Sequence, residues 1–406
     1  MIAIEERLAA AGLPALPRMA WLEIDLDAIA VNLRLLRELA GPTVPVHPVV
    51  KADAYGHGAV PVAQALVRAG VDGLCVATLD EALALRLGGV SGPIHVLYPV
   101  PVAGVGDAAT NGLSVTLGDH TLVEGLLAAV AALPPGTPAL AVHIEVETGL
   151  GRGGIAVAEL AAAVARLAAA PGIRPAALWT HLQAPEDDGL TSVQLARFQV
   201  ASEIARGVGL VLPRHAAASA GILTGNVPAF EGIRPGLAMY GLIPDELEPG
   251  SPGTRAGAAL RPALSLHARP VRVADLPAGW GISYGPAFRT ERPSRIATLP
   301  FGYGDGWSRA LSNRAEALVR GMRVPIVGRV AMDAVMVDVT DVPGPPVDVR
   351  DPFVLIGHQG DVAITVADVA RQCTTNAWEV VTSMARRLPR VYHAASGPLG
   401  LRTLIG

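Results

Sequence analysis

The feature that most constrains the fold is an alternation, from residue 21 to about residue 245, of short apolar runs with Ala/Leu-rich stretches. The runs are rich in β-branched residues, and the stretches carry apolar residues at helical spacing. Repeated βα units place their strands parallel, so seven or eight of them predict an α/β fold with an N-terminal (β/α)8 TIM-like barrel. The predicted strands are 45–50, 73–77, 94–99, 113–117, 140–147, 177–181 and 236–240. Helices are predicted at 60–70, 78–89 and 157–172.

The texture of the sequence changes after about residue 248, where PGSPGTRAG is typical of a linker. Short strand-like runs separated by Gly/Pro turns follow, and an amphipathic helix is predicted near 366–387. The four runs are LSLHARPVRVADL, RIATLPFG, RVPIVGR and AVMVDVTDV. We therefore predict two domains, a barrel over 1–247 and a mostly-β domain over 248–406.

Composition argues against several classes of protein. The net charge is −4, and no Lys/Arg run forms a patch that could bind nucleic acid. Cys75 and Cys373 belong to no CxxC or Cys/His cluster, which argues against disulfides and a zinc site and favours a cytoplasmic protein without a metal. The N-terminus lacks the apolar run of a signal peptide. Residues 125–144 are uncharged, but Pro134–Gly136 would break a membrane-spanning helix, so no membrane is expected.

The chain contains a single lysine, Lys51, at the end of the apolar run in VVKADAYGHG (49–58). Barrel enzymes carry their chemistry at the carboxyl ends of their strands. A lysine in a dry pocket loses basicity and can form a Schiff base, the usual anchorage of pyridoxal 5'-phosphate (PLP). The alternative is a surface lysine left over by a composition that favours arginine, and the motif around Lys51 decides against it.

The stretches 49–58 and WLEIDLDAIAVNLRLL (21–36) closely resemble the alanine racemase family. The resemblance runs from Trp21 to about Tyr392, with the motifs in the same order. It implies that Lys51 binds PLP and acts as one of two catalytic bases. It also implies that Tyr55 reaches the phosphate of the cofactor.

A second motif, GIRPGLAMYG, spans 232–241. The resemblance implies that its Arg234 donates to the pyridine nitrogen of PLP. A guanidinium has no lone pair to accept a proton, so it keeps that nitrogen unprotonated. The cofactor is then a weaker electron sink, which limits side reactions in an enzyme that only removes and returns one proton.

Other cofactor contacts also follow from the resemblance. It assigns the phosphate to the main chain of Gly236 and Leu237 and to Ser219, and it packs His181 of LWTHLQ on the cofactor ring. Ala218 stands where the family usually has Asn, so one polar group near the phosphate is missing.

The third motif is WGISYGPAF, 280–288. Racemisation needs an acid/base on each face of the planar carbanion, because a single base would return the proton to the side it left. Tyr284 resembles the family's base on the face opposite Lys51, which the partner subunit of a homodimer contributes.

The segment TGLGRGG, 148–154, satisfies the GxGxxG pattern of dinucleotide sites. No acidic residue follows about twenty positions on to hold a ribose, so we interpret it differently. The resemblance places Arg152 near the substrate carboxylate. Glu145 stands where many members carry a carbamylated lysine, and we expect it to supply the negative charge directly by pairing with Arg152.

Two further motifs, GYGDGWSRAL (302–311) and GRVAMDAVMVDV (328–339), match family signatures. The resemblance implies that the backbone N–H of Met332 binds the substrate carboxylate, with Asp333 beside it. Ala331 and Ala334 stand where the family usually has Cys and Gln, and Arg386 stands where some members carry an entrance tyrosine. These changes alter the pocket mouth.

The expected reaction is the interconversion of L-alanine and D-alanine. A racemase for serine or for a broader set of amino acids stays open, because the pocket mouth differs. From another class, a non-catalytic PLP carrier also has a lysine-bearing barrel, but it lacks a second domain with an equivalent of Tyr284. A related decarboxylase would need a different carboxylate site.

Overall fold

The computed structural model describes residues 3–405. Its contacts divide the chain into two compact units, and each is described by itself. Unit 1 comprises Met1–Ala28, Tyr55–Gly58 and Pro262–Gly406, and unit 2 comprises Ile29–Ala54 and Ala59–Arg261. The domain boundaries 1–247 and 248–406 stay a prediction, because compactness alone does not define an independently folding domain.

Unit 2 contains a parallel sheet in the order β2-β3-β4-β5-β7-β8, with β6 paired to β5. The strands are β2 Leu74–Val76, β3 Ile94–Val96, β4 Leu113–Leu117, β5 Leu140–Glu147, β6 Ile155–Ala156, β7 Ile173–Trp179 and β8 Arg214–His215. Buried apolar residues such as Val96, Val115 and Ile144 fill these strands. This is the pattern of a sheet covered on both faces.

Two further segments close this sheet into a ring. Residues 45–50 pair with β2 through the bridge Val49↔Cys75 and with residues 231–235 through Val46↔Ile233. The ring is completed where the backbone N–H of Arg234 donates to the Ala217 carbonyl, 2.9 Å away, just after β8. The six ordered strands and these two segments make eight positions, which confirms the predicted barrel.

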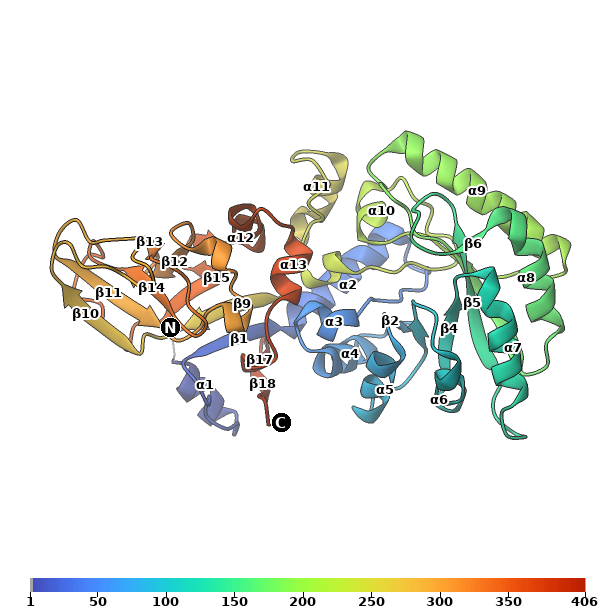
Figure 1. Cartoon of the computed structure of the whole chain (residues 1–406), viewed down its shortest axis with the longest axis horizontal. Coiled ribbons are helices and arrows are strands. Elements are labelled where there is room, and N and C mark those ends of the chain that lie inside the picture. The colour runs from blue at the N-terminus through green and yellow to red at the C-terminus, as the bar shows by residue number, and fades with distance from the viewer. Residues whose placement is uncertain (1–2, 406) are drawn as a thin grey trace. The chain divides into compact units, whose positions relative to one another are not determined.

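Helices alternate with these strands, and α5, α6 and α8 pack against β3, β4 and β7 respectively (Figure 1). The helices predicted at 60–70, 78–89 and 157–172 are confirmed as α4, α5 and α8. The helices after the first strand segment are α4 Ala59–Arg68, α5 Leu79–Leu87, α6 Val105–Thr110, α7 Val123–Ala131, α8 Val157–Ala169, α9 Asp188–Gly207, α10 Ser219–Thr224 and α11 Pro252–Ala256. Residues Leu26–Ala40 form α2.

One predicted strand is wrong. Residues 236–240 do not form a strand: Leu237–Tyr240 is the 3₁₀ helix η3, and residues 231–235 take the last position in the barrel. The Ser219 hydroxyl oxygen accepts hydrogen bonds from the Gly236 and Ala238 N–H groups, which removes donors that a strand would need.

Unit 1 is built around one long sheet in the order β10-β11-β14-β13-β12-β15-β9-β1-β17-β18, with β16 paired to β15. All its pairs are antiparallel except β1 with β17. This confirms the predicted mostly-β C-terminal part. The strands are β1 Ala20–Asp25, β9 Leu264–Ala268, β10 Arg272–Leu276, β11 Ser294–Leu299, β12 Glu316–Val319, β13 Met322–Val327, β14 Val335–Asp338, β15 Phe353–Gln359, β16 Val362–Ile364, β17 Arg390–Ala394 and β18 Gly397–Arg402.

The single helix expected near 366–387 is wrong as well. Two shorter helices, α12 Val366–Cys373 and α13 Ala377–Thr382, occupy the region. Thr374 has a φ of 57°, which ends α12, and the Asn376 side chain accepts the Glu379 N–H, which starts α13. The N-terminal segment adds α1, Ile4–Ala10. Within residues 3–405, no helix has the length and apolarity needed to cross a bilayer.

Candidate active site

Lys51 follows the barrel segment 45–50 directly and begins an unusual turn, α3 Lys51–Tyr55. Ala52, Asp53 and Ala54 all have φ between 51° and 56°, the left-handed helical region. For non-glycine residues this region costs about 1–2 kcal/mol per residue. Local hydrogen bonds stabilise the turn: the Ala59 N–H donates to the Asp53 carboxylate at 2.8 Å, and the Ala52 N–H donates to Glu81 at 2.6 Å.

The Lys51 ammonium is partly buried, and its environment favours the neutral amine. Burial lowers its pKa, and the nearby Arg152 lowers it further, while Glu81 acts in the opposite direction. Within residues 3–405 the Lys51 amine forms no ion pair. A lysine with a depressed pKa is a better nucleophile and a better base near neutral pH.

Arg234 is buried, with 3% of its surface exposed, at the end of the 231–235 segment. One terminal nitrogen donates to the His215 Nδ1 and carbonyl, and the other donates to the Thr180 carbonyl at 2.9 Å. The guanidinium also lies over the Trp179 ring, 4.8 Å from its centroid. Burial lowers the pKa of Arg234 to about 10, so it stays charged at neutral pH. Three of its five N–H groups are used, which leaves two for a ligand.

His181 lies just beyond the carboxyl end of β7 and is fully neutral at physiological pH. Burial lowers its pKa to about 3, and the positive charges of Arg234, Arg152 and Lys51 lower it too. The side chains of these four residues are therefore close enough to interact electrostatically at one end of the barrel. A neutral, buried ring is suited to packing against a flat aromatic group.

Ser219 begins α10 and is buried. Its hydroxyl oxygen accepts the Gly236 N–H at 3.0 Å and the Ala238 N–H at 3.1 Å, so its own O–H is left to donate. Ala218 precedes α10 and offers no side-chain cap. The hydrogen bonds of the Ser219 hydroxyl thus bring together three residues that were expected to be neighbours: Ser219, Gly236 and Leu237.

Glu145 points from β5 and is buried, with 6% of its surface exposed. Burial raises its pKa to about 7, although Arg152 and Arg234 oppose the shift. The expected ion pair with Arg152 is not formed within residues 3–405. Arg152 is exposed instead, with its guanidinium 5.9 Å from the centre of the Tyr98 ring.

The glycine-rich segment 148–154 is held by a different carboxylate. Glu147 accepts hydrogen bonds from the Gly149 N–H, from the Leu150 N–H at 2.8 Å and from the Gly151 N–H at 2.9 Å. These are the donors that a phosphate would need in a dinucleotide site. The geometry supports the interpretation of GxGxxG as a structural loop.

Unit 1 carries the other predicted residues. Tyr284 lies in the loop between β10 and β11 with 74% of its surface exposed. Its neighbours Ser283 and Gly285 have positive φ, and the Ser283 hydroxyl donates to the Arg329 carbonyl at 2.6 Å. The tight turn makes Tyr284 project from the loop. Tyr55, the last residue of α3, is buried and also belongs to unit 1.

Met332 and Asp333 occupy a turn that an ionic network around the buried Asp305 supports. The Arg387 guanidinium donates to the Asp333 carboxylate at 2.5 Å and to the Met332 carbonyl at 3.5 Å. Asp305, fully buried, accepts from Arg387 at 2.7 Å and from Arg18 at 2.8 Å. A charge-assisted network of this kind holds a turn more rigidly than neutral contacts do.

Comparison with known proteins accounts for both units. Residues 24–244 match the family described as alanine racemase, N-terminal domain, and residues 263–392 match alanine racemase, C-terminal domain. The chain belongs to the alanine racemase family. The family resemblance inferred from the motifs is thereby confirmed.

Individual members of the family are similar over nearly the full chain. Alanine racemase of Symbiobacterium thermophilum is 40% identical over 378 residues, covering 92% of this chain and 97% of the relative. Alanine racemase of Sorangium cellulosum is 39% identical over 382 residues, covering 91% and 98%.

Solved structures of alanine racemases give the same result. The enzyme from Bacillus anthracis, with bound L-Ala-P, has a TM-score of 0.87 at 34% identity and covers 97% of this chain and 99% of its own. The enzyme from Bartonella henselae, with covalently bound pyridoxal phosphate, has a TM-score of 0.79 at 29% identity and covers 93% and 100%.

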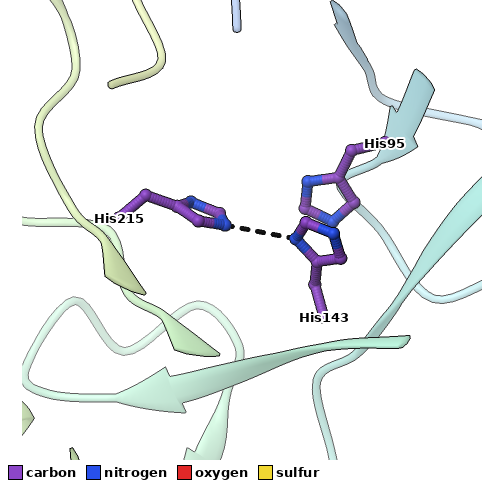
Figure 2. A group of neighbouring side chains, drawn as sticks. All are labelled: His95, His143 and His215. Carbon is purple, nitrogen blue, oxygen red and sulfur yellow. Dashed lines mark hydrogen bonds between the residues drawn. The ribbon is translucent and has the colours of Figure 1, made fainter. Parts of the chain in front are cut away.

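The motif-based reasoning missed a cluster of histidines in this alanine racemase barrel. His95, His143 and His215 lie on β3, β5 and β8, and their rings point toward one another (Figure 2). Each sits in a strand among buried apolar residues, which is the one signal that could have found them: a polar residue at an inward-facing position.

Proposed function

We propose that the protein interconverts L-alanine and D-alanine by exchange of the α-proton between two bases, with PLP held on Lys51. The observation that carries the proposal is the position of Lys51: it follows a barrel segment directly, its pKa is lowered, and it shares an end of the barrel with the buried donor Arg234. The similarity to alanine racemases over more than nine-tenths of the chain supports it.

The side chains of the barrel fit PLP. Arg234 keeps two N–H groups available and has no lone pair, so it suits an unprotonated pyridine nitrogen. Ser219 keeps its O–H for a phosphate oxygen, and the neutral His181 suits a stacked ring. The residues that would hold the cofactor are Lys51, Tyr55, His181, Ser219, Arg234, Gly236 and Leu237. When bound, PLP supplies an electron sink that stabilises negative charge at the α-carbon.

The two proposed bases belong to different compact units. The Lys51 amine takes or returns the α-proton on one face, and the Tyr284 hydroxyl does so on the opposite face. Both are needed, because inversion requires that the proton leave on one side and arrive on the other. The lowered pKa of Lys51 brings its proton exchange closer to neutral pH.

The substrate carboxylate would be oriented by Arg152 and by the backbone N–H of Met332, with Asp333 beside it. The network around Asp305 and Arg387 supports the Met332 turn. Glu145 would act through space on Arg152, since its carboxylate lowers the free energy of a nearby cation when it is ionised.

We further propose a homodimer in which Tyr284 and Met332 complete the partner's site. The exposed large side chains of unit 1 include Trp280 at 52%, Tyr284 at 74%, Tyr303 at 45% and Met332 at 53%. Exposed aromatic and methionine side chains are typical of protein interfaces.

Cys75 and Cys373 are free thiols, which agrees with a cytoplasmic location.

The first test is incubation of the PLP-loaded protein with L-alanine and L-serine, separately, in heavy water. Exchange of the α-proton followed by NMR, together with D-alanine detected by chiral chromatography, would support the proposal. Equal rates on serine would favour a broad-specificity racemase. If the bound cofactor keeps its lysine-linked absorbance but neither amino acid exchanges, the racemase proposal fails and a PLP carrier is favoured.

A further inference from the structure

Three histidines inside the barrel form a cluster next to Arg234, in which His143 and His215 share a hydrogen bond and His95 stacks on His143. His95, His143 and His215 come from three different strands, and a nitrogen of each lies within 4.8 Å of a nitrogen of the others (Figure 2). Burial lowers the pKa of His95 and of His215 well below the ordinary value, and lowers that of His143 to about 3. All three rings are therefore neutral at physiological pH, and each carries one ring proton.

The contacts fix where the ring protons lie. Arg234 can only donate, so the His215 Nδ1 that it contacts must accept and carries no proton. The proton of His215 is then on Nε2, which lies 3.1 Å from Nδ1 of His143. His143 must accept there, so its own proton is on Nε2. The result is a chain with one direction, from Arg234 through His215 to His143.

His95 holds the end of this chain in place. The Thr116 hydroxyl donates to the Val96 carbonyl at 2.9 Å, so it accepts the Nε2 proton of His95, also at 2.9 Å. The His95 ring is thereby fixed, and it stacks on the His143 ring with centroids 3.9 Å apart and an interplanar angle of 25°. A fixed stacking partner keeps the His143 ring from turning its Nδ1 away.

We propose that His143 is a positioning residue for Arg234, acting through His215. Without an acceptor at position 143, the His215 Nε2 proton is buried and unpaired, and the His215 ring can regain a partner for it only by turning. Turning the ring takes its Nδ1 away from Arg234. Arg234 would lose one of three acceptors and shift away from its place. The proposal rests on the proposed function insofar as Arg234 serves the cofactor.

Three imidazoles are also the protein ligands of some zinc enzymes. Here the Nδ1 lone pair of His215 is directed at a buried guanidinium, and its Nε2 carries the proton that a metal would have to displace. A divalent cation would also sit beside the charge of Arg234 in a low-dielectric interior, where like charges repel strongly. The geometry therefore favours the hydrogen-bonded chain over a metal site.

The first measurement is NMR of the PLP-loaded wild-type protein labelled with ¹⁵N-histidine, which reports which ring nitrogen carries the proton. The expected result is the Nε2–H form for His215, assigned with a His215→Gln sample. An Nδ1–H form would overturn the proposal. This readout does not depend on racemase activity, so the chain is tested even if the proposed function fails.

The second measurement compares His143→Leu with His143→Asn, two side chains of nearly equal size. The asparagine oxygen can accept near the position of Nδ1, whereas leucine cannot. Hydrogen bonds that involve a charged group contribute about 1.5–3 kcal/mol, so kcat should fall roughly tenfold to a hundredfold in the leucine variant. The asparagine variant should keep kcat within about threefold and keep the Nε2–H form of His215.

Equal losses in the two variants would overturn the proposal, because they would show that the ring at position 143 matters only for packing. Wild-type kcat in His143→Leu would overturn it too. Titration of the protein with Co²⁺ alone tests whether the three histidines bind a metal. Visible absorption bands that appear in the wild type and are absent in His143→Leu would show a metal site and overturn the proposed hydrogen-bonded chain.

Discussion

The burial of Glu145 predicts a pH-dependent change in stability. Its pKa is raised from 4.5 to about 7, so the folded protein holds this proton more tightly than the unfolded chain does. The stability gained from the protonated acid is fully present below pH 4.5 and is lost as the pH rises through about 7. Glu145→Gln removes this titration and keeps the shape of the side chain.

The magnitude follows from the shift. With 1.36 kcal/mol per pKa unit, the wild type should lose about 2.5 kcal/mol relative to Glu145→Gln between about pH 5 and about pH 8.5. The side chain is only 6% exposed, so solvent screens little of this effect. The free energy of unfolding of the variant minus that of the wild type should therefore be larger at the higher pH than at the lower pH by that amount.

The assay is urea unfolding of the PLP-free protein at one protein concentration, because the stability of an oligomer depends on concentration. The matched control is Glu203→Gln, an acid-to-amide change on the exposed face of α9. Its stability difference from the wild type should be the same at both pH values. If the stability difference between Glu145→Gln and the wild type is also the same at both pH values, the Glu145 carboxyl is ionised without cost and the reasoning is refuted.

Three further results are expected. Glu145→Ala should lose racemase activity, because no anion then acts on Arg152, the arginine proposed to bind the substrate; wild-type rates with alanine would contradict this. Asp305→Asn should lower the free energy of unfolding by about 1.5–3 kcal/mol, since the partly exposed Arg18 and Arg387 lose the buried carboxylate that pairs with both. The exposed Asp341→Asn should leave the free energy of unfolding nearly unchanged, and urea unfolding of both variants decides. Tyr284→Phe should abolish chiral inversion while the absorbance of the lysine-bound cofactor persists, and D-alanine formed at the wild-type rate would remove Tyr284 from the mechanism.

The barrel could be predicted because its signal is local and repeated. Apolar runs with helices between them leave few arrangements other than parallel strands, and this gave the place of Lys51 at the end of a strand segment. The error at 236–240 came from hydrogen bonds that bring together distant residues: Ser219 binds two N–H groups of a run that otherwise reads as a strand.

The electrostatic details could not be predicted from spacing. The seven-residue interval between Glu145 and Arg152 suggested an ion pair, but the glycine-rich loop holds Arg152 outside, over Tyr98. The histidine cluster is even less visible, because its three members are 48 and 72 positions apart and meet only when the barrel closes. Such contacts depend on tertiary structure and leave no short motif.

Because Lys51 is the single lysine and begins the left-handed turn, proteolysis after lysine can report on the opening of that turn. A protease that cuts only after lysine has one target, the bond from Lys51 to Ala52, and cleavage would divide the 406 residues into pieces of 51 and 355. That bond begins the strained turn, which no protease can bind until it straightens. The rate of this single cut therefore measures how often the turn Lys51–Tyr55 opens, and a cofactor bound to the lysine would block the cut.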